Sequence, residues 1–287
     1  MKPMLAHIYE PHRVTYPVYV QPKLNGIRAL YQNGHFQSRD QLPFPNGLLD
    51  HLAKPLLEVF SPDAILDGEL YVHGWPLQRI NAAVTPVRLQ PTEDTVKVQY
   101  HIFDRAEYSL PFWNRYVSIT SFLTERLMGK VEMVSTSLVK NQAEADKTYA
   151  MCVDMGYEGQ MYRLGDCPYT TPKQPNDCST AFGRRGRLRF LSDQDNRTWH
   201  LLKRKDWQDD EFICVDMAEG EGKLQGTLGA VICQTKSNNR FSVGSGLSDS
   251  ERQHYWSNPP IGRLVKVKYL CLSDAGIPLN PTILCIL

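Results

Sequence analysis

The first candidate for chemistry is a lysine in a short turn between two strand-like runs. Lys23 stands beside Asn25 and Gly26, and the flanking runs 18–20 and 27–31 are rich in β-branched and aromatic residues, which favours two strands joined by a tight loop. A lysine attacks an electrophile only when its amine is neutral, a state that burial or a neighbouring cation promotes. The glycine would let a ligand approach the backbone closely. Taken alone, a solvated turn lysine is the commoner interpretation.

Carboxylates stand at two further places that invite explanation. Asp67 and Glu69 interrupt an otherwise apolar strand predicted over 65–72, and carboxylates inside a strand need a cation or hydrogen-bond donors. Glu158 follows a helix predicted over 142–155. Because Mg²⁺ usually takes one or two carboxylates together with substrate phosphates, all three acids are candidate ligands. The alternative for each is a salt-bridged or capping acid.

One aromatic residue and two lysines complete the set. Phe103 shares the polar side of a strand predicted over 96–103, where it either stacks on a base or fills a small core. Lys203 and Lys205 are two apart, so in a strand both side chains point the same way. Two adjacent ammonium groups repel each other unless an anion lies between them, and phosphate suits that place. The alternative is a solvated strand face.

The elements that must position these residues change in character along the chain. Leucines at helical spacing predict a helix over 48–57, which Pro55 makes unlikely to be smooth. Gly156 occupies the left-handed position that ends the helix over 142–155. After Trp207 short strands at close spacing predict a small β-barrel or sandwich; these strands cover 212–217, 229–233, 241–243 and 264–270.

Taken in order, these segments resemble the covalent nucleotidyltransferases, and specifically the small ATP-dependent DNA ligases of phages and bacteria. Residues 23–28 match the family's K-x-D-G-x-R motif, with Asn25 in place of the commoner Asp. The later motifs that follow in the family's order are Ser38-Arg39, Asp67-Gly68-Glu69-Leu70, Phe103-Asp104, Glu158-Gly159 and Leu202-Lys203-Arg204-Lys205. Segments that resemble the family's C-terminal barrel are 219–226, 229–230, 243–249 and 260–262.

The resemblance implies an α+β fold in two domains. Residues 1–206 would form a nucleotidyltransferase (ATP-grasp-like adenylation) domain of antiparallel sheets and helices. Residues 207–287 would form an oligonucleotide-binding (OB) β-barrel that holds DNA. The boundary lies near Asp206, where the run of short predicted strands begins.

The implied activity is the sealing of 5′-phosphate/3′-hydroxyl nicks in duplex DNA through a lysyl-AMP intermediate and a DNA-adenylate. Lys23 would be the nucleophile, and Lys203 and Lys205 would contact the α-phosphate. Gln21 and Arg28 would belong to the nucleotide-binding set, and Phe103 would stack on adenine. Glu158, with Asp67 or Glu69, would bind Mg²⁺ (or Mn²⁺). Glu69 could instead bind the ribose hydroxyls. Arg39 would contact the ribose or the phosphate at the nick.

DNA contacts would come from Arg28, Arg39 and an arginine-rich insertion. That insertion contains Arg184, Arg185, Arg187 and Arg189, which either contact phosphates or form a solvated loop. The segment 276–281 is uncharged where the family is usually basic, so residues that orient the pyrophosphate are not assigned. Rival functions are an RNA ligase or an RNA-capping guanylyltransferase of the same superfamily, and an inactive nucleic-acid-binding relative.

Composition excludes several classes. The 287 residues carry a net charge of +1, so DNA binding requires the basic residues to gather on one face. No apolar run is long enough for a membrane span, the N-terminus has no signal-like apolar stretch, and the seven cysteines form no C-x-x-C pair. We therefore expect a cytoplasmic monomer that acts on nicked double-stranded DNA, without membrane, disulfide or zinc.

Overall fold

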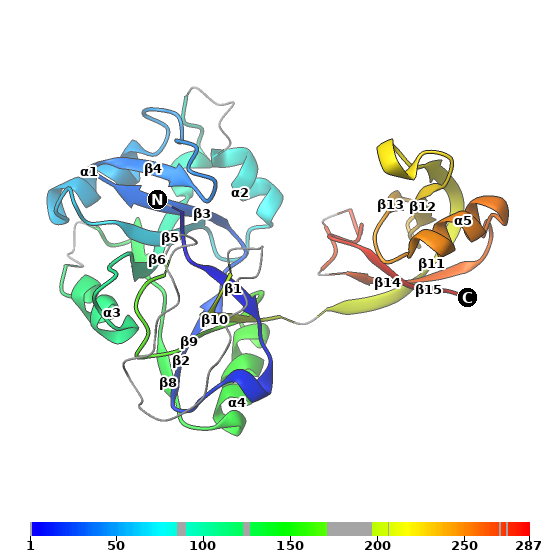
Figure 1. Cartoon of the computed structure of the whole chain (residues 1–287). Helices are drawn as coiled ribbons and strands as arrows, with labels where there is room; N and C mark the ends of the chain where they lie inside the picture. Colours follow the sequence, from blue (N-terminus) through cyan, green and yellow to red (C-terminus); the bar gives the residue numbers. More distant parts are fainter. Residues whose placement is uncertain are drawn as a thin grey trace. The chain divides into compact units, whose positions relative to one another are not determined.

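The computed structural model divides the chain into two compact units, residues 1–205 and 206–287, one residue before the predicted boundary. The residues that the structure describes are 2–84, 90–122, 127–170, 197–205, 207–269, 271–273 and 275–287. Figure 1 shows both units, with helices placed around the sheets of the first. None of the described helices is long and apolar enough to span a membrane.

The first unit is built on two five-stranded sheets. One sheet has the order β1 (Leu5–Ile8), β10 (Arg197–Arg204), β9 (Gly159–Arg163), β2 (Val18–Lys23) and β8 (Ser137–Val139). The other has the order β4 (His35–Ser38), β3 (Ile27–Gln32), β5 (Leu66–Tyr71), β6 (Gln99–Arg105) and β7 (Val131–Met133). Pairs within both sheets are antiparallel except β1 with β10 and β6 with β7. The predicted strand over 65–72 is confirmed as β5.

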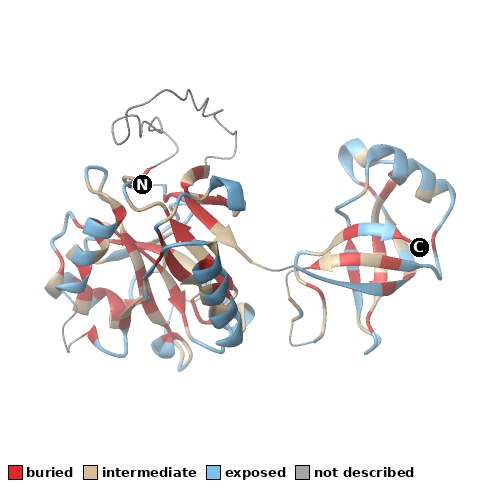
Figure 2. Cartoon of the chain, turned by 90° about the horizontal axis from the view of Figure 1, so that it is seen from below, coloured by how far each residue is buried: buried red, intermediate tan, exposed pale blue. Residues whose placement is uncertain are grey.

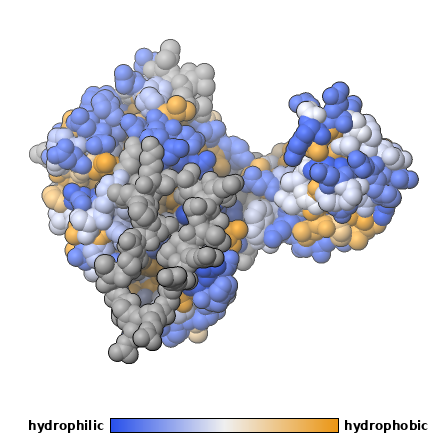
Figure 3. All heavy atoms as spheres, in the orientation of Figure 1, coloured by the Kyte–Doolittle hydropathy of each residue, from blue (hydrophilic) through white to orange (hydrophobic). Residues whose placement is uncertain are grey.

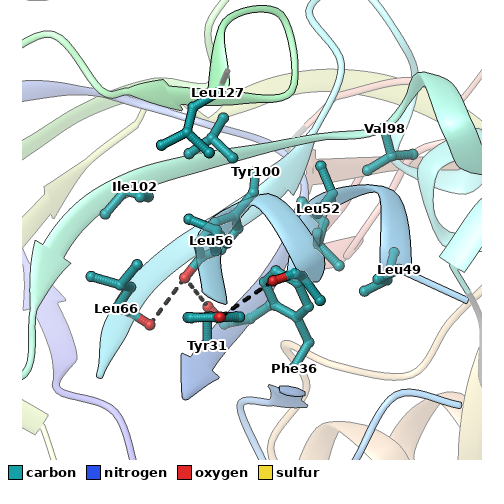
Figure 4. Close-up of a cluster of buried hydrophobic side chains, with 14 of the residues drawn as sticks. Tyr31, Phe36, Leu49, Leu52, Leu56, Leu66, Val98, Tyr100, Ile102 and Leu127 are labelled. Carbon is teal, nitrogen blue, oxygen red and sulfur yellow. Dashed lines mark hydrogen bonds between the residues drawn. The ribbon is translucent and has the colours of Figure 1, made fainter. Parts of the chain in front are cut away.

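The main core lies between the second sheet and α1 (Asp50–Val59). Leu52 and Leu56 of α1 are fully buried against Tyr100 of β6, whose hydroxyl donates to the carbonyls of Ala29 and Leu66 at 3.0 Å each (Figure 4). The helix continues through Pro55 without a break. Burial of its leucines outweighs the one backbone hydrogen bond that a proline removes.

Four other elements of the first unit surround the sheets. They are α2 (Leu77–Val84), α3 (Phe112–Thr120) and the 3₁₀ turns η1 (Pro11–Arg13) and η2 (Thr95–Lys97). The predicted strand over 96–103 is wrong in its first part, because η2 covers 95–97 and β6 begins at Gln99. In η2 the buried Thr95 hydroxyl donates to the Ala83 carbonyl at 2.8 Å, which holds the turn against α2.

Helix α4 (Gln142–Asp154) confirms the prediction over 142–155. The Asn141 side chain accepts a hydrogen bond from the amide of Glu144 and begins the helix. Gly156 has φ +83°, the left-handed conformation expected of the terminating residue. The helix therefore ends four residues before Glu158, which directly precedes β9.

The second unit is one five-stranded sheet and one helix. Its strands have the order β13 (Arg240–Val243), β12 (Leu228–Gln234), β11 (Gln208–Glu219), β14 (Leu264–Tyr269) and β15 (Thr282–Ile286). Helix α5 (Asp249–Ser257) lies between the third and fourth strands in sequence and begins with a capping box of Ser248 and Glu251. The 3₁₀ turn η4 (Gly222–Leu224) follows β11. This topology is that of an OB fold, and with the first unit it confirms the predicted α+β class.

The second unit buries one side of its sheet. Figure 2 shows buried and exposed positions alternating along its strands, as a strand with one solvated face requires. Figure 3 shows apolar side chains on the side of this unit where β14 and β15 lie. Leu264 of β14, Leu284 of β15 and the C-terminal Leu287 are exposed.

Candidate functional site

A pocket of about 560 Å³ in the first unit is lined by strands of both of its sheets. The sequence-predicted residues that line this pocket are Gln21, Lys23, Arg28, Arg39, Glu69, Phe103, Lys203 and Lys205. They come from β2, β3, β5, β6 and β10 and from the residues directly after β4 and β10. Side chains up to 184 positions apart in sequence therefore meet in one cavity.

Lys23 is the last residue of β2, and its ammonium group is hydrogen-bonded to Glu158. The Glu158 amide donates to the Lys23 carbonyl at 3.0 Å, so the two residues are also joined through the backbone. The second Glu158 oxygen accepts a bond from Lys205 Nζ at 3.3 Å. One carboxylate thus holds two lysines that line the pocket.

Glycines bring these strands together. A Cβ on Gly26 would collide with the Leu70 carbonyl and lie 2.8 Å from Cγ of Glu69. Gly26 therefore lets β5, rather than a ligand, approach the turn, which corrects the expectation from sequence. At Gly159 a Cβ would collide with the Arg204 carbonyl, so this glycine lets the end of β10 lie beside Glu158.

The lysines of β10 follow the expected alternation. Lys203 and Lys205 line the pocket, whereas Arg204 donates to the hydroxyl of Tyr162 at 3.3 Å and lies 4.1 Å from the Tyr149 ring centre. Burial lowers the pKa of Lys203, and the positive charges of Arg197 and its lysine neighbours lower it further. An anion bound beside this ammonium group would favour its charged form and oppose that lowering of the pKa.

Glu69 faces the pocket from β5 and accepts a hydrogen bond from the Gly26 amide at 3.2 Å. Burial raises the pKa of Glu69 to about 7, although the charges of Lys23 and Arg28 act in the opposite direction. The carboxyl group therefore titrates near neutral pH and is available to a cation or a hydroxyl.

Asp67 lies beneath the pocket and not in its wall. It is fully buried, accepts two bonds from Arg28 at 2.9 and 2.6 Å, and accepts a third from the Tyr169 hydroxyl at 2.6 Å. Burial by itself lowers the pKa of the Arg28 guanidinium. The negative charge of Asp67 and the hydrogen bonds to it outweigh burial, so the pKa of Arg28 lies above its ordinary value. Because Asp67 is fully buried and does not line the pocket, its position does not suit the metal-binding role expected of it.

Phe103 is partly exposed on the pocket wall and is the extra residue of a β-bulge. Asp104 pairs with Asp67 and Ile102 pairs with Gly68, which leaves Phe103 without a partner in the register of β5 and β6. Bulges commonly redirect a side chain near a functional site. The aromatic ring thus reaches the pocket from the sheet opposite Lys23.

Gln21 is 1% exposed although it contributes to the pocket lining. Its amide nitrogen donates to the carbonyl of Phe103 at 3.2 Å and to the hydroxyl of Thr136 at 2.9 Å. Its amide oxygen accepts from Arg163 at 2.7 Å. The polar side-chain atoms of Gln21 therefore bind the protein itself.

A buried charge network beside the pocket was missed from the sequence. Asp104 accepts two bonds from Arg115, at 2.8 and 3.0 Å, and one from Arg163, at 2.7 Å. All three residues are at most 3% exposed. The arginines are 11 and 59 positions from Asp104, and no local pattern pairs residues at such separations.

The remaining predicted residues differ in how far the structure describes them. Arg39 is exposed at the pocket edge, with its Nε 3.8 Å from Asp40. Arg184, Arg185, Arg187 and Arg189 lie outside the described residues.

Two carboxylates fit a magnesium ion bound with a phosphate ligand. In the described part of the chain, no three His, Cys, Asp or Glu side chains form a cluster that would hold a metal by themselves. Glu69 faces the pocket, and Glu158 is bonded to two of its lysines. Mg²⁺ commonly takes one or two carboxylates and fills its other positions with phosphate and water, which matches this donor set.

Comparison with known proteins gives the family. The model of the ATP-dependent DNA ligase domain matches residues 3–177, and the model of the DNA ligase OB-like domain matches residues 219–286. The first match alone covers more than half of the chain, so the chain belongs to the ATP-dependent DNA ligases.

Individual relatives agree with this family. A DNA ligase of African swine fever virus is 29% identical over 245 residues, 78% of this chain and 50% of the viral protein. A DNA ligase of Haemophilus influenzae is 24% identical over 96% of this chain and 88% of its own length. The chain thus spans half the length of its viral relatives and most of the bacterial one.

Solved structures show the same fold. A Lig E DNA ligase superimposes with a TM-score of 0.79 at 21% identity and covers 100% of this chain and 99% of its own. The Chlorella virus DNA ligase-adenylate gives a TM-score of 0.53 at 23% identity, covering 100% and 98%.

Proposed function

We propose that the chain is an ATP-dependent DNA ligase that seals nicks between a 5′-phosphate and a 3′-hydroxyl in duplex DNA. The single observation that carries the proposal is the meeting of Lys23, Lys205 and Phe103 at one pocket, with Glu158 bonded to both lysines. Its volume of about 560 Å³ lies within the range of ordinary ligand sites. We further propose that the protein works as a monomer in the cytoplasm.

In the first step Lys23 would form a bond to the α-phosphorus of ATP while the bond to pyrophosphate breaks. The amine is ion-paired with Glu158 in the free protein, and it attacks only after losing a proton. Competition for Glu158 from Lys205, and from any cation bound with ATP, weakens that pair. The product is a lysyl-AMP phosphoramide.

Other pocket residues would place the nucleotide. Lys203 and Lys205 would hold the α-phosphate, where negative charge develops, and Phe103 would stack on adenine. Arg39 would contact the ribose or, later, the phosphate at the nick. Arg28 would support the nucleotide from its place between Asp67 and the pocket.

Glu69 and Glu158 are the carboxylates that would hold Mg²⁺ or Mn²⁺, and binding of the ribose hydroxyls is the other role for Glu69. The metal would supply charge neutralisation at the phosphates. Asp67 has a supporting role in this proposal, because its bonds to Arg28 and Tyr169 fix the arginine that lines the pocket.

Two later steps would use the same pocket. AMP passes from Lys23 to the 5′-phosphate of the nick, and the 3′-hydroxyl then attacks that phosphate and releases AMP. The OB unit and Arg184, Arg185, Arg187 and Arg189 would hold the DNA through its backbone. Such contacts make binding insensitive to sequence and weaker at high salt.

The decisive experiment is labelling of the protein with α-³²P-ATP. Wild-type protein should form a labelled adduct, and Lys23→Ala should abolish it. Lys54→Ala is a matched control, because Lys54 is an exposed lysine paired with Asp50 on α1. Labelling of Lys23→Ala at the wild-type level would contradict the assignment of the nucleophile.

A second assay tests the substrate. Wild-type protein with ATP should seal a nicked DNA duplex, and replacing ATP with GTP should prevent sealing. Preference for RNA ends would instead indicate an RNA ligase, and transfer from GTP to RNA would indicate a capping enzyme. Formation of no nucleotide adduct would indicate an inactive nucleic-acid-binding relative.

A further inference from the structure

Arg163 crosses from one sheet of the first unit to the other. It is the last residue of β9 and is 3% exposed, yet it also contributes to the pocket lining. Its Nη1 bonds Asp104 Oδ2 of β6 at 2.7 Å, and its Nε bonds Gln21 Oε1 of β2 at 2.7 Å. One guanidinium group thus joins the two sheets that line the pocket.

The same group reaches the backbone of Phe103 through Gln21. Phe103 is the bulged residue of β6, without a partner in the register of β5 and β6. Its carbonyl accepts a hydrogen bond from Gln21 Nε2 at 3.2 Å, and the Gln21 oxygen is the acceptor for Arg163. The bulge therefore depends on a side chain that Arg163 orients.

Arg163 also contacts the aromatic ring itself. Its Cζ atom is 5.2 Å from the ring centre of Phe103 and 4.9 Å from that of Phe112. Arg28, held by Asp67, lies 5.4 Å from the same Phe103 ring. Phe103 is consequently fixed through its carbonyl by Gln21 and through its ring by two guanidinium groups.

The cost of this arrangement argues for a function beyond packing. Three arginines, Arg28, Arg115 and Arg163, share two carboxylates, Asp67 and Asp104, which leaves one positive charge in excess. Burial lowers the pKa of Arg163 despite the attraction of Asp104. Apolar residues often replace buried ion pairs without loss of stability, so cohesion alone does not require an arginine here.

We propose that Arg163 is a positioning residue that holds Phe103 in the place and orientation needed to receive the nucleobase, and that it thereby sets how tightly the pocket binds ATP. The inference rests on the proposed function. It assigns to Arg163 no contact with the reacting atoms: the side chain acts through Gln21, Asp104 and the Phe103 ring.

The test compares two arginines that bind the same carboxylate. Arg163→Lys keeps a charge near Asp104 but loses the planar group that bonds Gln21 and covers Phe103. Arg115→Lys is the matched control, because Arg115 bonds Asp104 from α3 and gives its other nitrogen to the carbonyls of Leu110 and Cys167. Gln21→Met is a further variant that cuts the link to the Phe103 carbonyl and keeps the Arg163–Asp104 pair.

Each variant is assayed for adduct formation at Lys23 over a range of ATP concentrations. For Arg163→Lys and Gln21→Met we expect the KM for ATP to rise roughly tenfold, the size of effect expected from a misplaced base–aromatic stack. The value of kcat should change less, because Arg163 does not contact the reacting atoms. Arg115→Lys should lower the melting temperature and keep the wild-type KM for ATP.

The outcomes separate this inference from the proposed function. Absence of an adduct in the wild-type protein would overturn the function itself. A wild-type adduct together with an unchanged KM for ATP in Arg163→Lys would overturn the inference alone. Equal rises in the KM for ATP in Arg163→Lys and Arg115→Lys would also overturn it, because they would indicate a general loss of rigidity around Asp104.

Discussion

The two units of this protein bury arginine in different ways. In the first unit Arg115 and Arg163 are at most 3% exposed and share the carboxylate of Asp104. In the second unit Arg252 of α5 is 8% exposed and donates to the carbonyls of Leu228, Gly229 and Gly244. The buried arginines of the first unit are neutralised by a carboxylate, whereas Arg252 of the second unit is hydrogen-bonded to neutral backbone carbonyls.

The difference shows what each buried cation does. Arg252 binds main-chain carbonyls at the start of β12 and after β13, so it fastens α5 to the sheet without a buried carboxylate as its partner. In the first unit the partners of the buried arginines are carboxylates that are also buried. One of them, Asp104, follows Phe103 in the chain, and the other, Asp67, bonds Arg28. A buried pair fixes direction as well as distance, which suits the wall of a pocket.

Removing Asp104 should break the first arrangement most strongly. Asp104→Ala leaves two buried guanidinium groups without their anion, and loss of one partner of a buried pair costs about 3–5 kcal/mol. We expect a corresponding loss in the free energy of unfolding and loss of adduct formation. Hydrogen–deuterium exchange should increase in β6 and β9, while exchange in β11 to β15 stays unchanged. Equal increases in both units would contradict the local origin of the effect.

Removing Arg252 should have a smaller effect, because its partners are neutral. Arg252→Met leaves buried carbonyls without donors, at a cost of about 2 kcal/mol. Faster exchange should be confined to β12, β13 and α5, and formation of the Lys23 adduct should continue at the wild-type rate. Faster exchange in β6 would refute the separation of the two networks.

Glu69 allows the role of pH to be tested. Burial raises its pKa to about 7 from 4.5, so the folded protein holds the proton more tightly than the unfolded chain does. The stabilisation is complete below about pH 4.5 and is lost as the pH rises through about 7. Relative to the wild type, Glu69→Gln should therefore gain about 2–3 kcal/mol in the free energy of unfolding between pH 5 and pH 8. Parallel stability curves in chemical denaturation would contradict this shift.

The smallest effect is expected at a surface pair of the second unit. Lys266 Nζ lies 3.0 Å from Asp209 Oδ2, and both side chains are more than 40% exposed. Solvent and salt screen such a pair, so Lys266→Ala should leave the melting temperature within experimental error of the wild type. A clear decrease, reproduced by Asp209→Ala, would show that exposed pairs contribute to this barrel.

The sequence predicted those helices and strands whose capping residues or apolar patterns lie within the element itself. The helix of residues 142–154 has a capping asparagine and a terminating glycine within its own span, and β5 and the strands of the OB unit follow apolar patterns. Helix α5 was not predicted, although Ser248 and Glu251 carry its capping box. The 3₁₀ turn at 95–97 was read as strand, because its dependence on the Ala83 carbonyl is not visible in a local pattern.

What the sequence determined by itself is the order of reactive groups along the chain: a lysine in a strand-ending turn, acids on β5 and before β9, and two lysines one strand period apart. What the tertiary structure decided is which of them face one another. Asp67 and Glu69 look alike in sequence and lie two residues apart on β5, yet Glu69 lines the pocket whereas Asp67 is fully buried against Arg28 and Tyr169. Likewise, Arg163 contacts Phe103 only because the packing of the two sheets brings β9 and β6 together.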